Sequence, residues 1–190
     1  MARLKKPIDY VKALRLSSDP ETRRLGETLH KQYLKWTKGL HLKDLLEFMQ
    51  NIQDNKERVG VAQLFGKFRA YSLEEFVCRL IQAKVSIPKS LDVHWGEKCL
   101  ILKRNGQQHG MEMDILVGKK IGGFIEPTVA VETKVELDAS RLKTALASFV
   151  LLKKRHSHMK CFLVYMIGEV RPLLLKLTEP WIDGIYINSA

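Results

Sequence analysis

One stretch of this 190-residue chain, residues 111–137 with the sequence MEMDILVGKKIGGFIEPTVAVETKVEL, constrains its fold and chemistry more than any other. It predicts two strands joined by a glycine-containing turn, with Asp114 on the first strand and Glu132 and Lys134 on the second. Alternate residues of a strand share one face of a sheet, so Glu132 and Lys134 point the same way. If the two strands pair with their polar faces matched, the two carboxylates and the lysine converge.

Such a convergence suits a divalent metal ion. Carboxylate oxygens are good ligands for Mg²⁺ or Mn²⁺, and Mg²⁺ commonly binds through one or two carboxylates together with water and substrate phosphate. The metal lowers the pKa of a bound water and neutralises charge that develops on phosphorus, while a neighbouring lysine can hydrogen-bond the attacking water. The pattern therefore indicates phosphodiester hydrolysis, with Asp114 and Glu132 as metal ligands and Lys134 assisting the water.

The triplet of an acidic residue, any residue and a lysine is not specific by itself. It also occurs at residues 54–56 (Asp-Asn-Lys), where the sequence predicts a polar helix end. Charged residues that alternate along a strand are common on the solvent-exposed face of antiparallel sheets. Context favours the catalytic interpretation of Glu132, because the apolar run at residues 128–131 leads directly into it.

The first part of the chain has helical periodicity. Apolar residues three and four positions apart predict helices over about residues 8–16, 20–39 and 42–53. Asp19 and Pro20 form a start signal, since aspartate is a good N-cap and proline suits the first helical position. We expect residues 1–69 to form a basic helical extension and residues 70–190 to form the core.

The chain is strongly basic, with 32 Lys and Arg against 21 Asp and Glu, a net charge of +11 and a pI near 9.6. This balance favours attraction to a polyanion such as DNA. Basic side chains on or near the solvent side of the second predicted helix are candidates for phosphate contacts: Arg23, Arg24, Lys31, Lys35 and Lys38. An ordinary solvated helix face is the alternative.

From Ser72 onward the order of elements becomes clearer. Ser72 and Glu75 match a capping box, which predicts a helix over about residues 73–84. Strands are then expected at about residues 91–95, 98–103, 112–117 and 128–137, with a hairpin turn at Asn105-Gly106. A helix at about residues 139–155, a buried strand at 161–167 and a last strand at 184–187 follow. A strand, a helix and another strand imply a parallel crossover, so the predicted fold is α/β, a mixed central sheet flanked by helices.

These residues and this order of elements resemble the PD-(D/E)xK superfamily, whose fold is that of the restriction endonucleases. The family motif is an Asp at the end of one strand, then Glu or Asp, any residue and Lys on the next strand. Asp114, Glu132 and Lys134 match it. The resemblance spans about residues 72–167 and implies a core of helix, three strands, helix and strand.

The resemblance also implies a further metal contact. In many members a glutamate of the first helix approaches the metal, and Glu74 or Glu75 stands at the matching place, although Glu75 is equally explained as the capping-box partner. One feature departs from the family motif, and another argues against two branches of the family. Met113, rather than proline, precedes Asp114, and the predicted helix after Lys134 contains no glutamine, which argues against the RecB-like and junction-resolving branches.

The expected function is therefore a Mg²⁺- or Mn²⁺-dependent DNA endonuclease. Because one such site attacks one strand at a time, cutting both strands of a duplex would require a dimer. Two alternatives stay open: a non-cleaving nucleic-acid-binding or assembly subunit with the same fold, and a nuclease acting on branched DNA or RNA. A serine or cysteine hydrolase is not indicated, since the sequence has no GxSxG elbow and no Cys/His signature.

We expect a cytoplasmic protein without a membrane partner. The N-terminus has basic residues but no apolar segment of the kind found in secretory signals. The longest uncharged apolar runs are far shorter than the ~20 residues that a membrane-spanning helix needs. The three cysteines are far apart in the sequence, which is typical of buried thiols in a reducing compartment.

Overall fold

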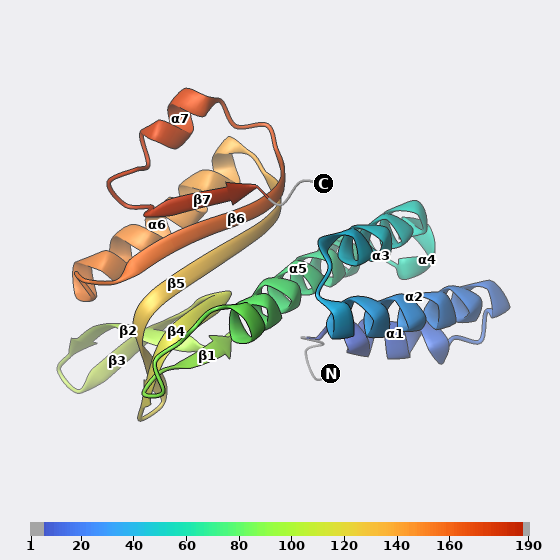
Figure 1. Cartoon of the computed structure of the whole chain (residues 1–190), viewed down its shortest axis with the longest axis horizontal. Coiled ribbons are helices and arrows are strands. Elements are labelled where there is room, and N and C mark those ends of the chain that lie inside the picture. The colour runs from blue at the N-terminus through green and yellow to red at the C-terminus, as the bar shows by residue number, and fades with distance from the viewer. Residues whose placement is uncertain (1–5, 188–190) are drawn as a thin grey trace. The chain divides into compact units, whose positions relative to one another are not determined.

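The computed structural model describes residues 6–187 and divides the chain into two compact units, one ending at Leu80 and the other beginning at Ile81 (Figure 1). The domain boundary expected at residue 70 falls inside helix α5 (Ala62–Lys84), which runs through it as one continuous helix.

Among its described residues, the N-terminal unit consists of helices joined by short turns. Its elements are α1 (Pro7–Arg15), α2 (Pro20–Gly39), α3 (Leu42–Asp54), α4 (Lys56–Val59) and most of α5. The predicted start of α2 is confirmed, because the Asp19 carboxylate accepts a hydrogen bond from the Thr22 amide at 2.8 Å. Aromatic rings fill the core of the unit: Phe68 meets Phe48 edge to face with centroids 5.7 Å apart and stacks on Tyr10 at 4.9 Å.

The predicted capping box at Ser72 is wrong, because α5 begins well before this residue. The Ser72 hydroxyl donates to the Phe68 carbonyl at 2.7 Å, a bond that serines in helix interiors often make. The Glu75 carboxylate accepts hydrogen bonds from the Tyr33 hydroxyl at 2.9 Å and from Arg79 Nε at 2.8 Å. Contacts within the folded unit therefore replace the local motif that the sequence suggests.

The C-terminal unit is a mixed sheet flanked by helices. Its strands are β1 (Asp92–Trp95), β2 (Lys98–Arg104), β3 (Gln107–Glu112), β4 (Ile115–Ile121), β5 (Phe124–Leu137), β6 (Lys160–Gly168) and β7 (Gly184–Ile187). Helix α6 (Ala139–Arg155) connects β5 to β6, and α7 (Pro172–Lys176) precedes β7. The sheet order is β1, β4, β5, β2, β3, and β6 pairs with both β5 and β7. The pairing of β5 with β6 is parallel, which confirms the predicted crossover.

Strand β5 is the central element of the sheet, and it begins four residues before the predicted start at residue 128. Its first part pairs antiparallel with β4, and its second part pairs in parallel with β6. Residues 129–131 belong to both pairings and so have partner strands on both sides. Ala130 and Val131 point to opposite faces of the sheet and both are buried, which explains why this run is apolar without alternation.

The single strand expected over residues 112–117 is wrong, because the chain forms two strands there, β3 and β4. The first pairs with β2, and the second pairs with β1 and β5. The change of partner occurs at Met113 and Asp114. The Met113 amide donates to the Glu97 carbonyl at 3.1 Å, and the Gly96 amide donates to the Asp114 carbonyl at 2.9 Å. These bonds tie the change of partner to the turn between β1 and β2.

An apolar core lies between α6 and the sheet. Its buried members on α6 recur at helical spacing: Leu142, Ala145, Phe149 and Leu152. They pack with buried residues of the strands, including Leu163 of β6 and Leu116 of β4. Within residues 6–187, no helix has the length and apolar character needed to cross a membrane.

Candidate active site

The candidate site lies where β4 begins beside the middle of β5. The sequence predicts Asp114 on a strand, which is wrong, because Asp114 occupies the position immediately before β4. At this point the chain leaves β2 in order to pair with β1 and β5. The register pairs Ile115 with Val131, and this pairing places Asp114 beside Glu132 and Thr133.

Asp114 is held by the backbone of the opposite strand. Its Oδ2 atom accepts a hydrogen bond from the Thr133 amide at 2.7 Å and lies 3.3 Å from the Thr133 hydroxyl. Bonds from a backbone amide to a carboxylate are short and strong. Thr133 is a residue that the sequence pattern misses, because it fills the unspecified position of the triplet and acts mainly through its main chain. Only the strand register reveals its role.

Lys134 lies between the two carboxylates. Its Nζ atom is 2.6 Å from Glu132 Oε2 and 3.6 Å from Asp114 Oδ2. These side chains are largely withdrawn from solvent, with exposed fractions of 11% for Glu132, 20% for Lys134 and 23% for Asp114. The structure therefore brings together the three residues that the sequence singles out.

The two carboxylates repel each other in this partly buried place. Burial, followed by the negative charge of Asp114, raises the pKa of Glu132 to about 7, and Lys134 opposes the rise. When all three groups are ionised, two negative charges face one positive charge. A bound cation would offset the remaining negative charge and favour the ionised form of Glu132.

The residues of the site fit Mg²⁺ or Mn²⁺. Over the described part of the chain, no group of three or more His, Cys, Asp or Glu side chains could hold a metal ion. Mg²⁺ does not require such a group, since it often uses one or two carboxylates and keeps several waters. Structural zinc sites, in contrast, take four protein ligands rich in Cys and His. The pair of Asp114 and Glu132 therefore suits a hard, partly hydrated cation.

Glu74 and Glu75 lie on α5 within the N-terminal unit, and both are buried, at 8% and 4% exposed. Glu75 forms an ion pair with Arg79 at 2.7 Å in addition to its bond from Tyr33. These partners compensate the charge of Glu75 without a metal ion. The expectation that Glu74 or Glu75 adds a metal ligand stays a prediction.

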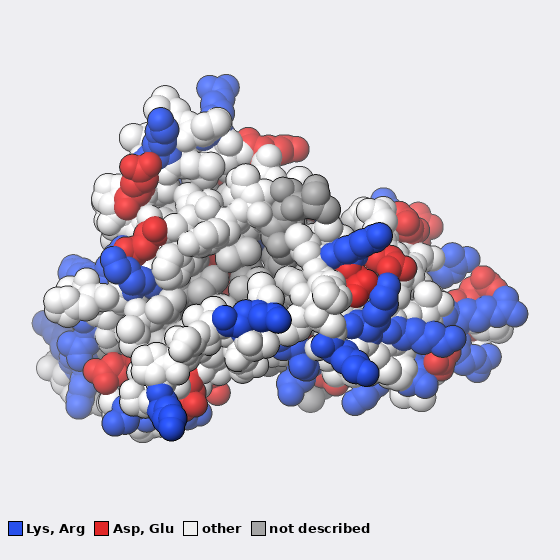
Figure 2. Space-filling view, in the orientation of Figure 1, with Lys and Arg blue, Asp and Glu red and all other residues white. Residues whose placement is uncertain are grey.

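The predicted phosphate-binding residues of α2 are all exposed: Arg23, Arg24, Lys31, Lys35 and Lys38. Lys35 forms ion pairs with Asp44 at 2.8 Å and with Glu47 at 3.4 Å, and Arg24 pairs with Glu21 at 3.0 Å. Both cations stay largely exposed, at 80% for Arg24 and 58% for Lys35, so these pairs leave them accessible to a phosphate. On the visible face of the helical unit, Lys and Arg side chains are numerous, with acidic ones among them (Figure 2). Their contact with DNA stays a prediction.

Among solved structures, the chain is similar to native BbvCI, described as an A2B2 tetramer at low resolution, with a TM-score of 0.60 and 16% sequence identity. The match covers 98% of this chain and 83% of that chain. BbvCI is a restriction endonuclease. The fold is restriction-endonuclease-like. This finding confirms the predicted fold class, and at such low identity it concerns the fold alone. No protein-family model and no curated protein matches the sequence.

Proposed function

We propose that this protein is a Mg²⁺-dependent endodeoxyribonuclease of the PD-(D/E)xK class that also accepts Mn²⁺. The observation that carries the proposal is the convergence of Asp114, Glu132 and Lys134 within a restriction-endonuclease-like fold. A fold hosts many functions, so the proposal rests on the chemistry of this site rather than on the fold.

Each residue of the site has a distinct role in the proposal. Asp114 and Glu132 would hold the metal ion, and the Thr133 amide keeps Asp114 in place. When bound, the ion would activate a water and offset negative charge on the scissile phosphate. Lys134, which contacts both carboxylates, would donate a hydrogen bond from Nζ to the attacking water or to a phosphate oxygen.

DNA is the proposed substrate, and two copies of the chain are proposed to act together on a duplex. The net charge of +11 favours a polyanionic partner, and the exposed basic residues of α2 would contact phosphates. One site cuts one strand, so a symmetric pair of sites matches the two-fold symmetry of a duplex. The tetrameric state of BbvCI supports an assembly of several chains but does not identify its composition here.

A cleavage panel tests the proposal. The full chain is incubated with supercoiled plasmid, linear duplex, four-way junction, single-stranded DNA and RNA, in Mg²⁺, in Mn²⁺ and in EDTA. We expect cleavage of duplex DNA that requires the metal ion. Glu132→Gln, which removes one charge with little change of shape, should slow cleavage by roughly 100- to 1,000-fold. Asp54→Asn, in the second acidic-x-Lys triplet, is the matched control and should cleave normally.

The outcomes separate the alternatives. Failure to cut any substrate in either metal, together with tight DNA binding, would identify a non-cleaving subunit and contradict the proposal. Cleavage of RNA or of the junction alone would contradict duplex DNA as the substrate. Normal cleavage by Glu132→Gln would show that the reaction occurs elsewhere in the molecule.

A further inference from the structure

Strands β2 and β3 form a hairpin whose outer part is polar and exposed. The strands meet at Asn105 and Gly106, whose φ angles of 49° and 76° are those of a two-residue type I′ turn. Every residue from 102 to 109 is exposed to solvent. The segment KRNGQQH at residues 103–109 therefore presents its side chains to water rather than to a core.

The outer part of this hairpin pairs only with itself in the described structure. Among the described residues, β2 has a single register pair with β5, Cys99 with Ile125, and β3 pairs with β2 alone. A bulge between Leu100 and Leu102 separates the attached base from the outer part. An isolated two-stranded ribbon is marginally stable and gains little from polar side chains. Packing inside this unit therefore does not explain the composition of the hairpin.

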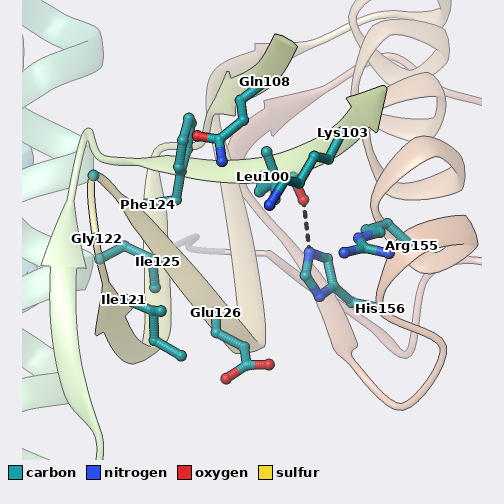
Figure 3. A pocket seen from close by; sticks show the side chains of 11 residues that line it. Leu100, Lys103, Gln108, Ile121, Gly122, Phe124, Ile125, Glu126, Arg155 and His156 are labelled. Carbon is teal, nitrogen blue, oxygen red and sulfur yellow. Dashed lines mark hydrogen bonds between the residues drawn. The ribbon is translucent and has the colours of Figure 1, made fainter. Parts of the chain in front are cut away.

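One face of the hairpin packs toward the rest of the sheet. Lys103 and Gln108 are register partners, and both line a cavity of about 370 Å³ together with Phe124 and His156 (Figure 3). A ring nitrogen of His156 lies 2.8 Å from the Leu100 carbonyl, and this contact ties the base of the hairpin to the end of α6. This face belongs to the attachment of the hairpin.

The opposite face is exposed to solvent over the described part of the chain. Alternation along paired strands places Leu102, Arg104, Gln107 and His109 together, since Leu102 pairs with His109 and Arg104 pairs with Gln107. These four residues line a hollow of about 460 Å³ formed by the hairpin itself, which Asn105 and Gln108 also border. The free face, defined by these four residues, thus offers a guanidinium, an amide, an imidazole and one apolar group side by side.

The chemistry of the free face matches the base edges of duplex DNA. Residues 98–110 contain three basic residues and no acidic one, so the ribbon attracts a polyanion. Arginine pairs with the two acceptors of guanine, glutamine pairs with the donor and acceptor of adenine, and an apolar side chain contacts the thymine methyl group. A two-stranded ribbon fits the major groove, which is about 12 Å wide and about 8.5 Å deep. Three residues of a strand span roughly 10 Å, which is enough to reach the groove floor.

We propose that the β2–β3 hairpin enters the major groove and that its free face reads the base sequence, with Arg104 and Gln107 as the main specificity residues. The inference rests on the proposed function only in taking duplex DNA as the partner. It adds a target-reading element that is separate from the carboxylate site.

Selection from a randomised duplex library tests the inference with the full chain. Binding is measured in EDTA and separately in Ca²⁺, so that Mg²⁺-dependent cleavage does not remove bound sequences. We expect the wild-type protein to enrich a defined sequence. Gln107→Ala should lower the preference for the favoured base at one position by roughly 5- to 150-fold and leave the salt dependence of binding unchanged, because a neutral side chain releases no counterions.

Matched variants make the test specific to one face. Gln108→Ala changes the same residue type at the next position, which the strand alternation places on the attached face beside Lys103, and should keep the wild-type preference. Arg104→Ala should relax the preference at a second position, whereas Arg171→Ala, an exposed arginine outside the hairpin, should not. Melting curves check that each variant is folded.

The results distinguish this inference from the proposed nuclease function. Absence of any enriched sequence, an equal effect of Gln107→Ala and Gln108→Ala, or binding to RNA or protein in place of duplex DNA would overturn the role of the hairpin. If the wild-type protein cleaves DNA but the hairpin variants keep its sequence preference, the proposed role of the hairpin is wrong and the nuclease proposal stands. If the hairpin variants lose the sequence preference but the wild-type protein cleaves no DNA in any metal, the nuclease proposal is wrong and the role of the hairpin is supported.

Discussion

Two segments of this chain share the acidic-x-Lys pattern, and the structure places them in opposite surroundings. The β5 triplet, residues 132–134, lies within the central strand, where Lys134 contacts two carboxylates. The helix-end triplet, residues 54–56, spans the end of α3 and the start of α4. Its Asp54 is exposed and accepts a hydrogen bond from the side-chain amide of Gln50 at 2.7 Å.

The difference shows what converts a charge pattern into a chemical site. In the β5 triplet, the sheet withdraws the charges from water, and a neighbouring strand end supplies Asp114 as a second carboxylate. Charges interact strongly where water is excluded, and weakly at an exposed helix end where solvent and salt screen them. The comparison therefore predicts large effects of substitutions in the β5 triplet and small effects of the same substitutions in the helix-end triplet.

The largest expected effect is the difference in cleavage rate between substitutions of the two lysines. Lys134→Ala should slow cleavage of duplex DNA by roughly 100- to 10,000-fold, because it removes the group proposed to assist the attacking water. Lys56→Ala should leave the rate within about twofold of wild type. Rates measured in Mg²⁺ under single-turnover conditions test both. Equal loss in the two variants would mean that the lysines act through general attraction to DNA, and the comparison would fail.

A smaller effect is expected on metal-linked stability. Mn²⁺ at 100 times its dissociation constant should stabilise the wild-type protein by about 2.7 kcal/mol, since it binds only the folded site. For a domain of this size the gain corresponds to a rise in Tm of roughly 5–10 °C. Asp114→Asn should abolish the rise and Asp54→Asn should keep it. Melting curves with and without Mn²⁺ provide the measurement, and a rise retained by Asp114→Asn would place the metal elsewhere.

The smallest effect concerns the middle residues of the triplets. Thr133→Val keeps the amide that binds Asp114 and loses only the hydroxyl at 3.3 Å, so cleavage should fall by less than about tenfold. Asn55→Ala removes a bond from Asn55 Nδ2 to the Asn51 carbonyl at 2.9 Å and should cost about 1 kcal/mol of stability without slowing cleavage. A loss of more than 100-fold in Thr133→Val would show that the hydroxyl, rather than the amide, positions Asp114.

The sequence predicts the centre of the site well because its information there is local. Alternation along β5 puts Glu132 and Lys134 on one face, and a glycine-containing turn folds this strand back toward Asp114. The apolar run at residues 128–131 likewise identifies a strand with covered faces. Each of these signals depends on residues close together in the chain, so the predicted convergence agrees with the structure.

The predictions that are wrong depend on contacts between distant residues. β3 has one partly buried apolar side chain, Met111, among polar residues and glycine, so periodicity does not separate it from β4. The capping motif at Ser72 is overridden because Glu75 bonds to Tyr33, a residue of another helix. The position of Asp114 before β4 depends on the pairing of residues 96–97 with residues 113–114, which no local pattern encodes.

The pairing of β5 on both edges has a consequence for the order in which parts of the molecule unfold on heating. Its amides at residues 129–131 are engaged in the middle of the sheet, so they should exchange with solvent deuterium only when the whole unit unfolds. Within residues 6–187, the hairpin residues 102–109 have no neighbouring strand beyond their own pair, so they should exchange through local opening at lower temperature. On warming, discrimination between targets should therefore be lost before the ability to cut, and the protein would become less selective before it becomes inactive.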